Sequence, residues 1–182
     1  MFKKIAITSA TAALIGIGQG AWAGATAASP FTITATVTKS CAVSTPPGAQ
    51  SATYDPVTGT QVDFFPSITF SCTRGSTGVY VSATLGANAS GTQRRLYDGT
   101  STYLNYQLYK PLAGTPSSCT GSYSTIYDST AAANAGDYLV AASNFATSTT
   151  AVTVALCGRI ASGQDATATS SYQDTVNVTV YY

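Results

Sequence analysis

The sequence predicts an all-β protein, and three observations support this prediction: recurring segments in which apolar and polar residues alternate, clusters of turn-forming residues between them, and very few helical signals. Strict alternation is typical of strands that bury one face. Clusters of Gly, Pro, Asn and Ser are typical of turns and loops. Since no strand–helix–strand repeat is visible, we expect short antiparallel strands packed as a single β-sandwich.

The strand candidates follow one another along the chain, and we expect about seven to nine strands. The long loop between the first two candidates contains Pro46, Pro47 and Pro56, which block backbone pairing. A short Ala-rich segment, residues 129–136, is compatible with one helical turn. The segments with strand character are residues 31–41, 62–72, 78–86, 94–109 as a hairpin that turns at Asp98-Gly99, 137–142, 147–160 and 172–182.

The start of the chain is typical of an export signal. Two lysines precede an apolar run over residues 5–17, and Ala21 and Ala23 form the small-x-small site that a signal peptidase cleaves. The alternative, a membrane anchor, is disfavoured because a spanning helix needs about 20 apolar residues. We therefore expect residues 1–23 to be a signal peptide for Sec-dependent export.

Composition excludes several classes of function. Eight Lys and Arg residues oppose seven acidic residues, all of them Asp, so no basic face for nucleic acid is expected. The chain has no His and no Glu, which removes the usual general bases and every Ser-His or Cys-His nucleophile. The Asp residues lie in turn-like contexts such as YDPVTG and YDGT, where Asp side chains bond backbone amides. We therefore expect neither an enzyme nor a cofactor.

The four cysteines, Cys41, Cys72, Cys119 and Cys157, predict disulfides, because an even number of Cys in an exported chain is typical of them. Four thiols allow three pairings, and the sequence alone does not choose among them. We favour the sequential pairing, Cys41 with Cys72 and Cys119 with Cys157. Since no C-x-x-C spacing and no His are present, we expect no metal site.

Arg94-Arg95 and the twelve tyrosines are the remaining binding candidates. Adjacent strand residues face opposite ways, so we expect one arginine to reach solvent and the other to brace a neighbouring loop. Contact with a sulfated sugar or an acidic partner is the alternative. The tyrosines are compatible with a sugar-binding platform, but tyrosine is also an ordinary strand residue with a polar tip.

Several stretches of the chain, taken in order, match a known pattern. The last is CGRI at residues 157–160, followed by Gly163-Gln164 and a Tyr-x-Asp-Thr-Val pattern over residues 172–182. Earlier stretches are the TITATVTKSCAVS segment, Tyr54-Asp55-Pro56, and RRLYDGTSTYLNYQLY. This ordered set resembles the spore coat protein U domain, which is shared with subunits of archaic chaperone–usher pili.

The resemblance implies an incomplete immunoglobulin-like β-sandwich that lacks its final strand. In such subunits a periplasmic chaperone first supplies a strand beside the C-terminal strand. At the outer-membrane usher, the N-terminal extension of the next subunit replaces it. On this basis we expect residues 24–33 to form a donor-strand extension, with an uncertain boundary, and residues 34–182 to form the sandwich domain.

The C-terminal segment agrees physically with the resemblance. Its apolar positions are Val176, Val178, Val180 and Tyr182, and no charge or proline follows Asp174 to protect the strand edge. A strand from another chain would satisfy this edge, because main-chain hydrogen bonds give affinity and alternate side chains fill pockets. We therefore expect these four residues to mark the acceptor edge strand.

The candidate donor lies near the N-terminus. Phe31, Ile33 and Ala35 alternate with threonines, and we expect Phe31 and Ile33 to be the largest plugs. Burying each of them contributes about 1.5–3 kcal/mol. Donation is head-to-tail and does not close, so it builds a filament rather than a ring.

The leading hypothesis is therefore a shaft subunit of a bacterial surface pilus that serves adhesion or biofilm formation. Its partners would be like subunits, a periplasmic chaperone and an outer-membrane usher, and it would pass through the periplasm to the cell surface. One alternative is a monomeric, secreted, lectin-like sandwich whose terminal strand pairs with the chain's own N-terminal strand. Another is a protective coat protein of a spore or cyst.

Overall fold

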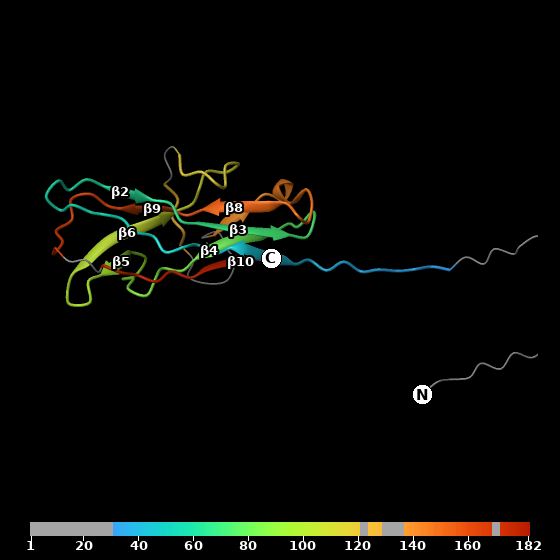
Figure 1. Ribbon diagram of the computed structural model, residues 1–182, viewed down its shortest axis with the longest axis horizontal. Helices are drawn as coiled ribbons and strands as arrows, with labels where there is room; N and C mark the ends of the chain where they lie inside the picture. Colours follow the sequence, from blue (N-terminus) through green and yellow to red (C-terminus); the bar gives the residue numbers. More distant parts are fainter. Residues whose placement is uncertain (1–30, 121–123, 129–136, 169–171) are drawn as a thin grey trace, which may run out of the picture. The chain divides into compact units, whose positions relative to one another are not determined.

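In a computed structural model, residues 31–120, 124–128, 137–168 and 172–182 are described, and they contain ten β-strands and one 3-10 helix (Figure 1). This composition confirms the predicted all-β class. The elements in chain order are β1 (Cys41–Thr45), β2 (Val62–Phe64), β3 (Ser67–Cys72), β4 (Val79–Ala83), β5 (Arg94–Tyr97), β6 (Tyr103–Tyr109), β7 (Tyr138–Val140), η1 (Ala142–Phe145), β8 (Ala151–Ala155), β9 (Cys157–Ile160) and β10 (Val178–Tyr181).

The described strands form three antiparallel sheets. Their strand orders are β1-β3-β8, β10-β4-β7 and β2-β9-β6-β5. Strands that are distant in the chain lie side by side, since β2 pairs with β9 and β10 pairs with β4. The arrangement is consistent with an immunoglobulin-like sandwich, in which inner faces of facing sheets share one core.

Two of the sheets are joined by one long ladder. Val62 pairs with Ile160 at one end and Ser71 pairs with Ala151 at the other, with the same register throughout. At the junction the Leu156 amide donates to the Pro66 carbonyl at 2.8 Å. Proline has no amide hydrogen, so regular pairing is interrupted there. The predicted segments 62–72 and 147–160 therefore contain two strands each, which raises the strand number above the predicted range.

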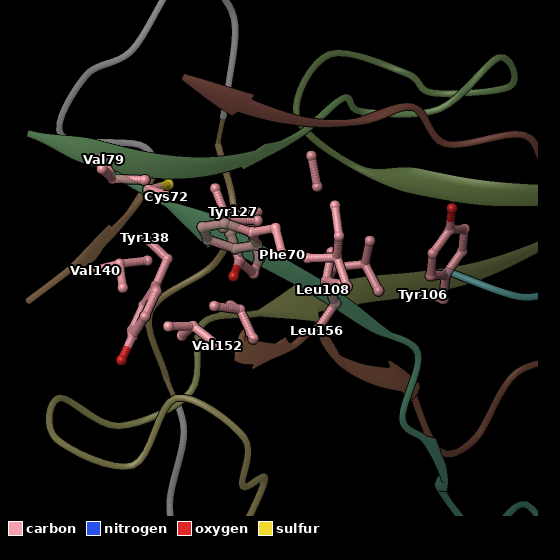
Figure 2. Packing of buried hydrophobic residues seen from close by; sticks show 14 of the residues in the cluster. Phe70, Cys72, Val79, Tyr106, Leu108, Tyr127, Tyr138, Val140, Val152 and Leu156 are labelled. Carbon is pink, nitrogen blue, oxygen red and sulfur yellow. The ribbon is translucent and has the colours of Figure 1, made fainter. Parts of the chain in front are cut away.

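The core lies between the sheets and is built from the inward positions of these short strands (Figure 2). In β3 the buried side chains alternate along the strand, as period-two patterning predicts, whereas in β4 Ser82 is buried along with Val79, Val81 and Ala83. Fully burying one such aliphatic or aromatic side chain stabilises the fold by about 1.5–3 kcal/mol. The largest apolar side chains with the least exposure are Tyr127, Phe70, Phe145, Leu156, Ile160, Val79, Val81, Val140 and Val154.

The structure contains two disulfides, Cys41–Cys72 and Cys119–Cys157. The first joins directly opposed residues of β1 and β3. The second joins the segment after β6 to the first residue of β9. The first disulfide therefore fastens β1 to β3, and the second fastens the segment after β6 to β9.

The first predicted strand is placed differently in the structure. The alternation over residues 31–41 predicted a strand that ends at Cys41, whereas β1 begins there and residues 31–40 have no regular structure. Residues 37–182 form one compact unit, and residues 31–36 belong to a separate one. Alternation specifies which side chains share a face, but a strand also needs a partner that supplies hydrogen bonds.

Some expectations fall outside the described residues. They concern the signal peptide with Ala21 and Ala23, the first part of the donor extension, and the helical turn over residues 129–136. Among the described residues, no helix has the length and apolar character needed to cross a bilayer.

Candidate functional site

A groove of about 980 Å³ lies against the inner face of the β2-β9-β6-β5 sheet. One wall is the loop of residues 47–56, here named the loop wall. A second wall is formed by residues 172–176 and Val178, here named the C-terminal wall. Figure 2 shows part of the floor from close by. The floor side chains are Phe64, Leu104, Tyr106, Leu108, Leu156 and Ile160.

The floor is apolar because the alternation in β6 places its apolar residues on one face. Leu104, Tyr106 and Leu108 are buried, while the preceding Tyr103 and the intervening Asn105 are exposed and the intervening Gln107 is half-buried. In the neighbouring ladder Phe64 faces Gly158, and a Cβ atom on this glycine would collide with the Phe64 ring. Glycine therefore lets the aromatic ring lie over the strand.

The C-terminal wall leads into β10, which lies at the edge of its sheet beside β4. No residue in the described ranges pairs with the other edge of β10. The acceptor candidates Val176, Val178 and Val180 are partly buried against the core, whereas Tyr182 is 53% exposed. The structure therefore brings three of the four candidates to the core and leaves the fourth largely in solvent.

Asp174 fixes the C-terminal wall to the floor. Its carboxylate accepts the Tyr106 hydroxyl at 2.6 Å and the Asn88 amide at 3.1 Å. Burial, reinforced by this carboxylate, raises the pKa of Tyr106 well above its ordinary value. Gly86 has a positive φ of 92°, and any Cβ atom there would collide with the Asp174 carboxylate. Sequence reasoning treated Asp174 only as a turn residue and missed this contact between segments.

The arginine pair is divided between the two faces of β5. Arg94 has 0% exposure, and its guanidinium makes five hydrogen bonds, four to the carbonyls of Ala83, Thr84 and Tyr127 and one to the Gln107 side chain. Burial lowers the pKa of Arg94. Arg95 lies 4.0 Å over the Tyr103 ring. The predicted bracing role is found for Arg94.

Several aspartates make structural contacts. Asp55 and Asp98 accept backbone amides in their turns, as predicted. Asp63 differs from the prediction, because it lies in β2 and forms an ion pair with Arg159 at 2.8 Å. Within the ranges that the structure describes, no group of three or more His, Cys, Asp and Glu side chains is placed to hold a metal ion.

The donor candidates lie in the separate unit of residues 31–36. Phe31 is 82% exposed and Ile33 is 79% exposed, and Ala35 is also exposed. Two large apolar side chains in solvent on one short segment are unusual unless a partner covers them.

The model of the Spore Coat Protein U domain matches residues 27–179. The chain therefore belongs to the spore coat protein U domain family, which confirms the resemblance drawn from its sequence. This is a family of structural proteins rather than enzymes. A search of curated proteins gave no match.

Among solved structures, the chain is similar to a chain of the CsuC–CsuE chaperone–tip adhesion subunit pre-assembly complex from the archaic chaperone–usher Csu pili of Acinetobacter baumannii. The TM-score is 0.40 and the sequence identity is 20%. The match covers 81% of this chain and 41% of that chain, so the present chain spans about two fifths of that chain's length.

Proposed function

We propose that this protein is a subunit of a bacterial surface pilus, assembled by donation of a strand from one subunit to the next. The observation that carries the proposal is the groove with an apolar floor beside β10, an edge strand whose outer side has no partner among the described residues. Such an edge is a template for strand addition. Membership of the spore coat protein U domain family supports the same reading.

The N-terminal extension supplies the donor in this proposal. Phe31, Ile33 and Ala35 would enter the groove of the neighbouring subunit and face its apolar floor. Val176, Val178 and Val180 would line the acceptor edge, with Tyr182 at its end. Before assembly a periplasmic chaperone would cover the same edge, and an outer-membrane usher would catalyse the exchange. The subunit would thus travel from the periplasm to the cell surface and serve in the shaft, in adhesion or in biofilm formation.

The coat-protein function remains the second candidate, because the matching family is named for a spore coat component. Strand-exchanged chains in a layer and in a fibre share the same groove chemistry. The two functions differ in location: electron microscopy of the producing cells would show fibres in the first case and a continuous layer in the second.

The proposal is tested by electrophoresis of material sheared from producing cells, run in SDS without heating and after heating. Strand-exchanged assemblies dissociate slowly, because a whole strand must leave its groove. We expect a ladder of subunit multiples that collapses to one band on heating. A single monomer band in both lanes would contradict the proposal and favour a self-completed sandwich.

A further inference from the structure

Three residues that are distant in the sequence are connected by hydrogen bonds beside the groove. The Tyr54 hydroxyl accepts the backbone amide of Gln164 at 2.7 Å and donates to its carbonyl at 3.2 Å. The Gln164 side chain accepts the backbone amide of Asn105 at 2.6 Å and donates to its carbonyl at 2.9 Å. Gln164 is thus bonded on both sides, through its backbone to Tyr54 and through its carboxamide to Asn105.

The Asn105 contact has the pattern of a strand pairing. A carboxamide presents one acceptor and one donor in a plane, and here both meet the backbone groups of a single strand residue. The same Gln164 side chain also donates to the Ala161 carbonyl at 2.8 Å, which holds the side chain in this orientation. We name the Tyr54–Gln164–Asn105 connection the Gln164 link.

The Gln164 link joins the loop wall to the floor of the groove. Tyr54 belongs to the loop wall, and Asn105 lies in β6 between the floor residues Leu104 and Tyr106. A second tie lies close by, since the Gly163 amide donates to the Gly59 carbonyl at 2.9 Å.

The rest of the loop wall is weakly held. Residues 47–53 have no regular structure and are mostly exposed. Among the described residues, the Gln50 side chain bonds to the carbonyls of Gly48 and Ala49, both within the same loop. The loop wall is therefore held mainly near its ends, by β1 on one side and by the Tyr54 contact on the other.

We propose that Tyr54 and Gln164 are positioning residues that hold the loop wall in place, so that the groove is formed before a donor strand arrives. This inference rests on the proposed function and adds residues that determine how tightly the donor strand binds. A wall that is already ordered does not have to be ordered on binding, and the affinity rises accordingly. Neither residue supplies an apolar plug site.

The test uses the purified full chain and a biotinylated synthetic peptide of residues 24–40 as the probe. The amount of peptide that survives unheated SDS electrophoresis on the subunit is measured against peptide concentration. For the unaltered protein we expect saturable incorporation. For Tyr54→Phe and for Gln164→Ala we expect the half-saturating peptide concentration to rise roughly tenfold, because the donor must now order the loop wall.

The double variant tests whether the two residues act in series. If both residues belong to one link, removing the second contact has little further effect once the first is gone. The half-saturating peptide concentration of the double variant should then stay within about twofold of that of the single variant that binds the peptide less tightly. Multiplied single effects would overturn the Gln164 link. Thermal unfolding midpoints of all variants should stay within about 4 °C, which separates positioning from general destabilisation.

Thr58→Ala is the matched control, because it removes a hydrogen bond to the Asp55 carbonyl of the loop wall without touching Gln164. We expect its half-saturation to equal that of the unaltered protein. Unchanged half-saturation in Tyr54→Phe and Gln164→Ala would overturn the inference while leaving the proposed function intact. Failure of the unaltered protein to incorporate the peptide would instead overturn the proposed function itself.

Discussion

At the scale of single residues, Arg94 and Arg95 are two neighbours of the same type that occupy opposite faces of β5. Arg94 points inward, where all five of its hydrogen bonds end on oxygen atoms of the protein. Arg95 points outward, stacks on Tyr103 and bonds the Asn88 carbonyl. A buried polar group that loses its partner costs more than the hydrogen bond itself contributes. The inward arginine should therefore dominate the energetics of this strand.

We expect Arg94→Met to lower the free energy of unfolding by about 2–4 kcal/mol, because three backbone carbonyls lose this donor in a buried site. The matched control is Arg95→Met, which should cost about 1 kcal/mol or less, since it removes one hydrogen bond and one cation–π contact at a half-buried position. Urea unfolding followed by circular dichroism measures both. Equal losses in the two variants would contradict the role assigned to Arg94.

Tyr127 provides the second prediction at this scale. Burial raises the pKa of its phenol, with smaller contributions from Tyr138 and Asp137, and its hydroxyl has no hydrogen-bond partner among the described residues. The unfolded chain releases this proton near pH 10, while the folded chain keeps it. The stability that this raised pKa contributes is therefore fully present below pH 10. Above pH 10 the free energy of unfolding falls by about 1.4 kcal/mol per pH unit for each such tyrosine.

Tyr127→Phe removes this titration and a hydroxyl without a described partner. At pH 7 we expect the variant to be as stable as the unaltered protein, or more stable by about 1 kcal/mol. Between pH 10 and pH 11 its stability should fall less steeply than that of the unaltered protein. Urea unfolding at pH 7, 10 and 11 measures both effects, and identical slopes would show that Tyr127 does not titrate as its burial requires.

At the scale of elements, the sequence predicted most strands and the hairpin turn at Asp98, because face alternation and turn chemistry are local signals. It placed the first strand before Cys41 rather than after it, since alternation does not reveal which segment finds a partner. It also missed the break at Pro66, where one ladder passes between two sheets. The contact of Gln164 with Asn105 spans 59 residues of sequence, and no local pattern predicts it.

The two disulfides make a quantitative prediction about elements. Their sequence separations, 31 and 38 residues, are similar, so restriction of the unfolded chain predicts about 3–4 kcal/mol for each. Each disulfide joins one buried cysteine, Cys72 or Cys157, to one partly buried cysteine, Cys41 or Cys119. Replacing either pair by Ala should therefore cost a similar free energy of unfolding, since the closed loops are similar and each variant leaves one small buried cavity. Urea unfolding of the two double variants measures both losses, and a much larger loss in one of them would contradict this prediction.

At the scale of the whole molecule, the groove and the N-terminal extension provide two complementary surfaces on one chain. The groove presents an apolar floor, and the extension carries exposed apolar side chains on a segment that lacks charge from residue 24 to residue 38. A contact between different surfaces of identical subunits is head-to-tail and extends without limit. A fibre follows from the proposed strand donation without any additional interface.

The alternation within the extension allows this assembly to be tested with two neighbouring residues. In a donor strand Ile33 would face the groove and Thr32 would face away, because successive side chains point to opposite sides. Ile33→Asp would bring a charge against an apolar floor, where an unpaired carboxylate is very costly. We therefore expect Ile33→Asp to abolish the heat-sensitive ladder of sheared material while the subunit is still exported. Thr32→Asp, the matched control, carries the same charge on the outward face and should assemble in amounts within about twofold of the unaltered protein. Assembly of Ile33→Asp at the unaltered level would exclude Ile33 as a plug, and loss of assembly in both variants would place the requirement in the uncharged character of the extension rather than in its alternating face.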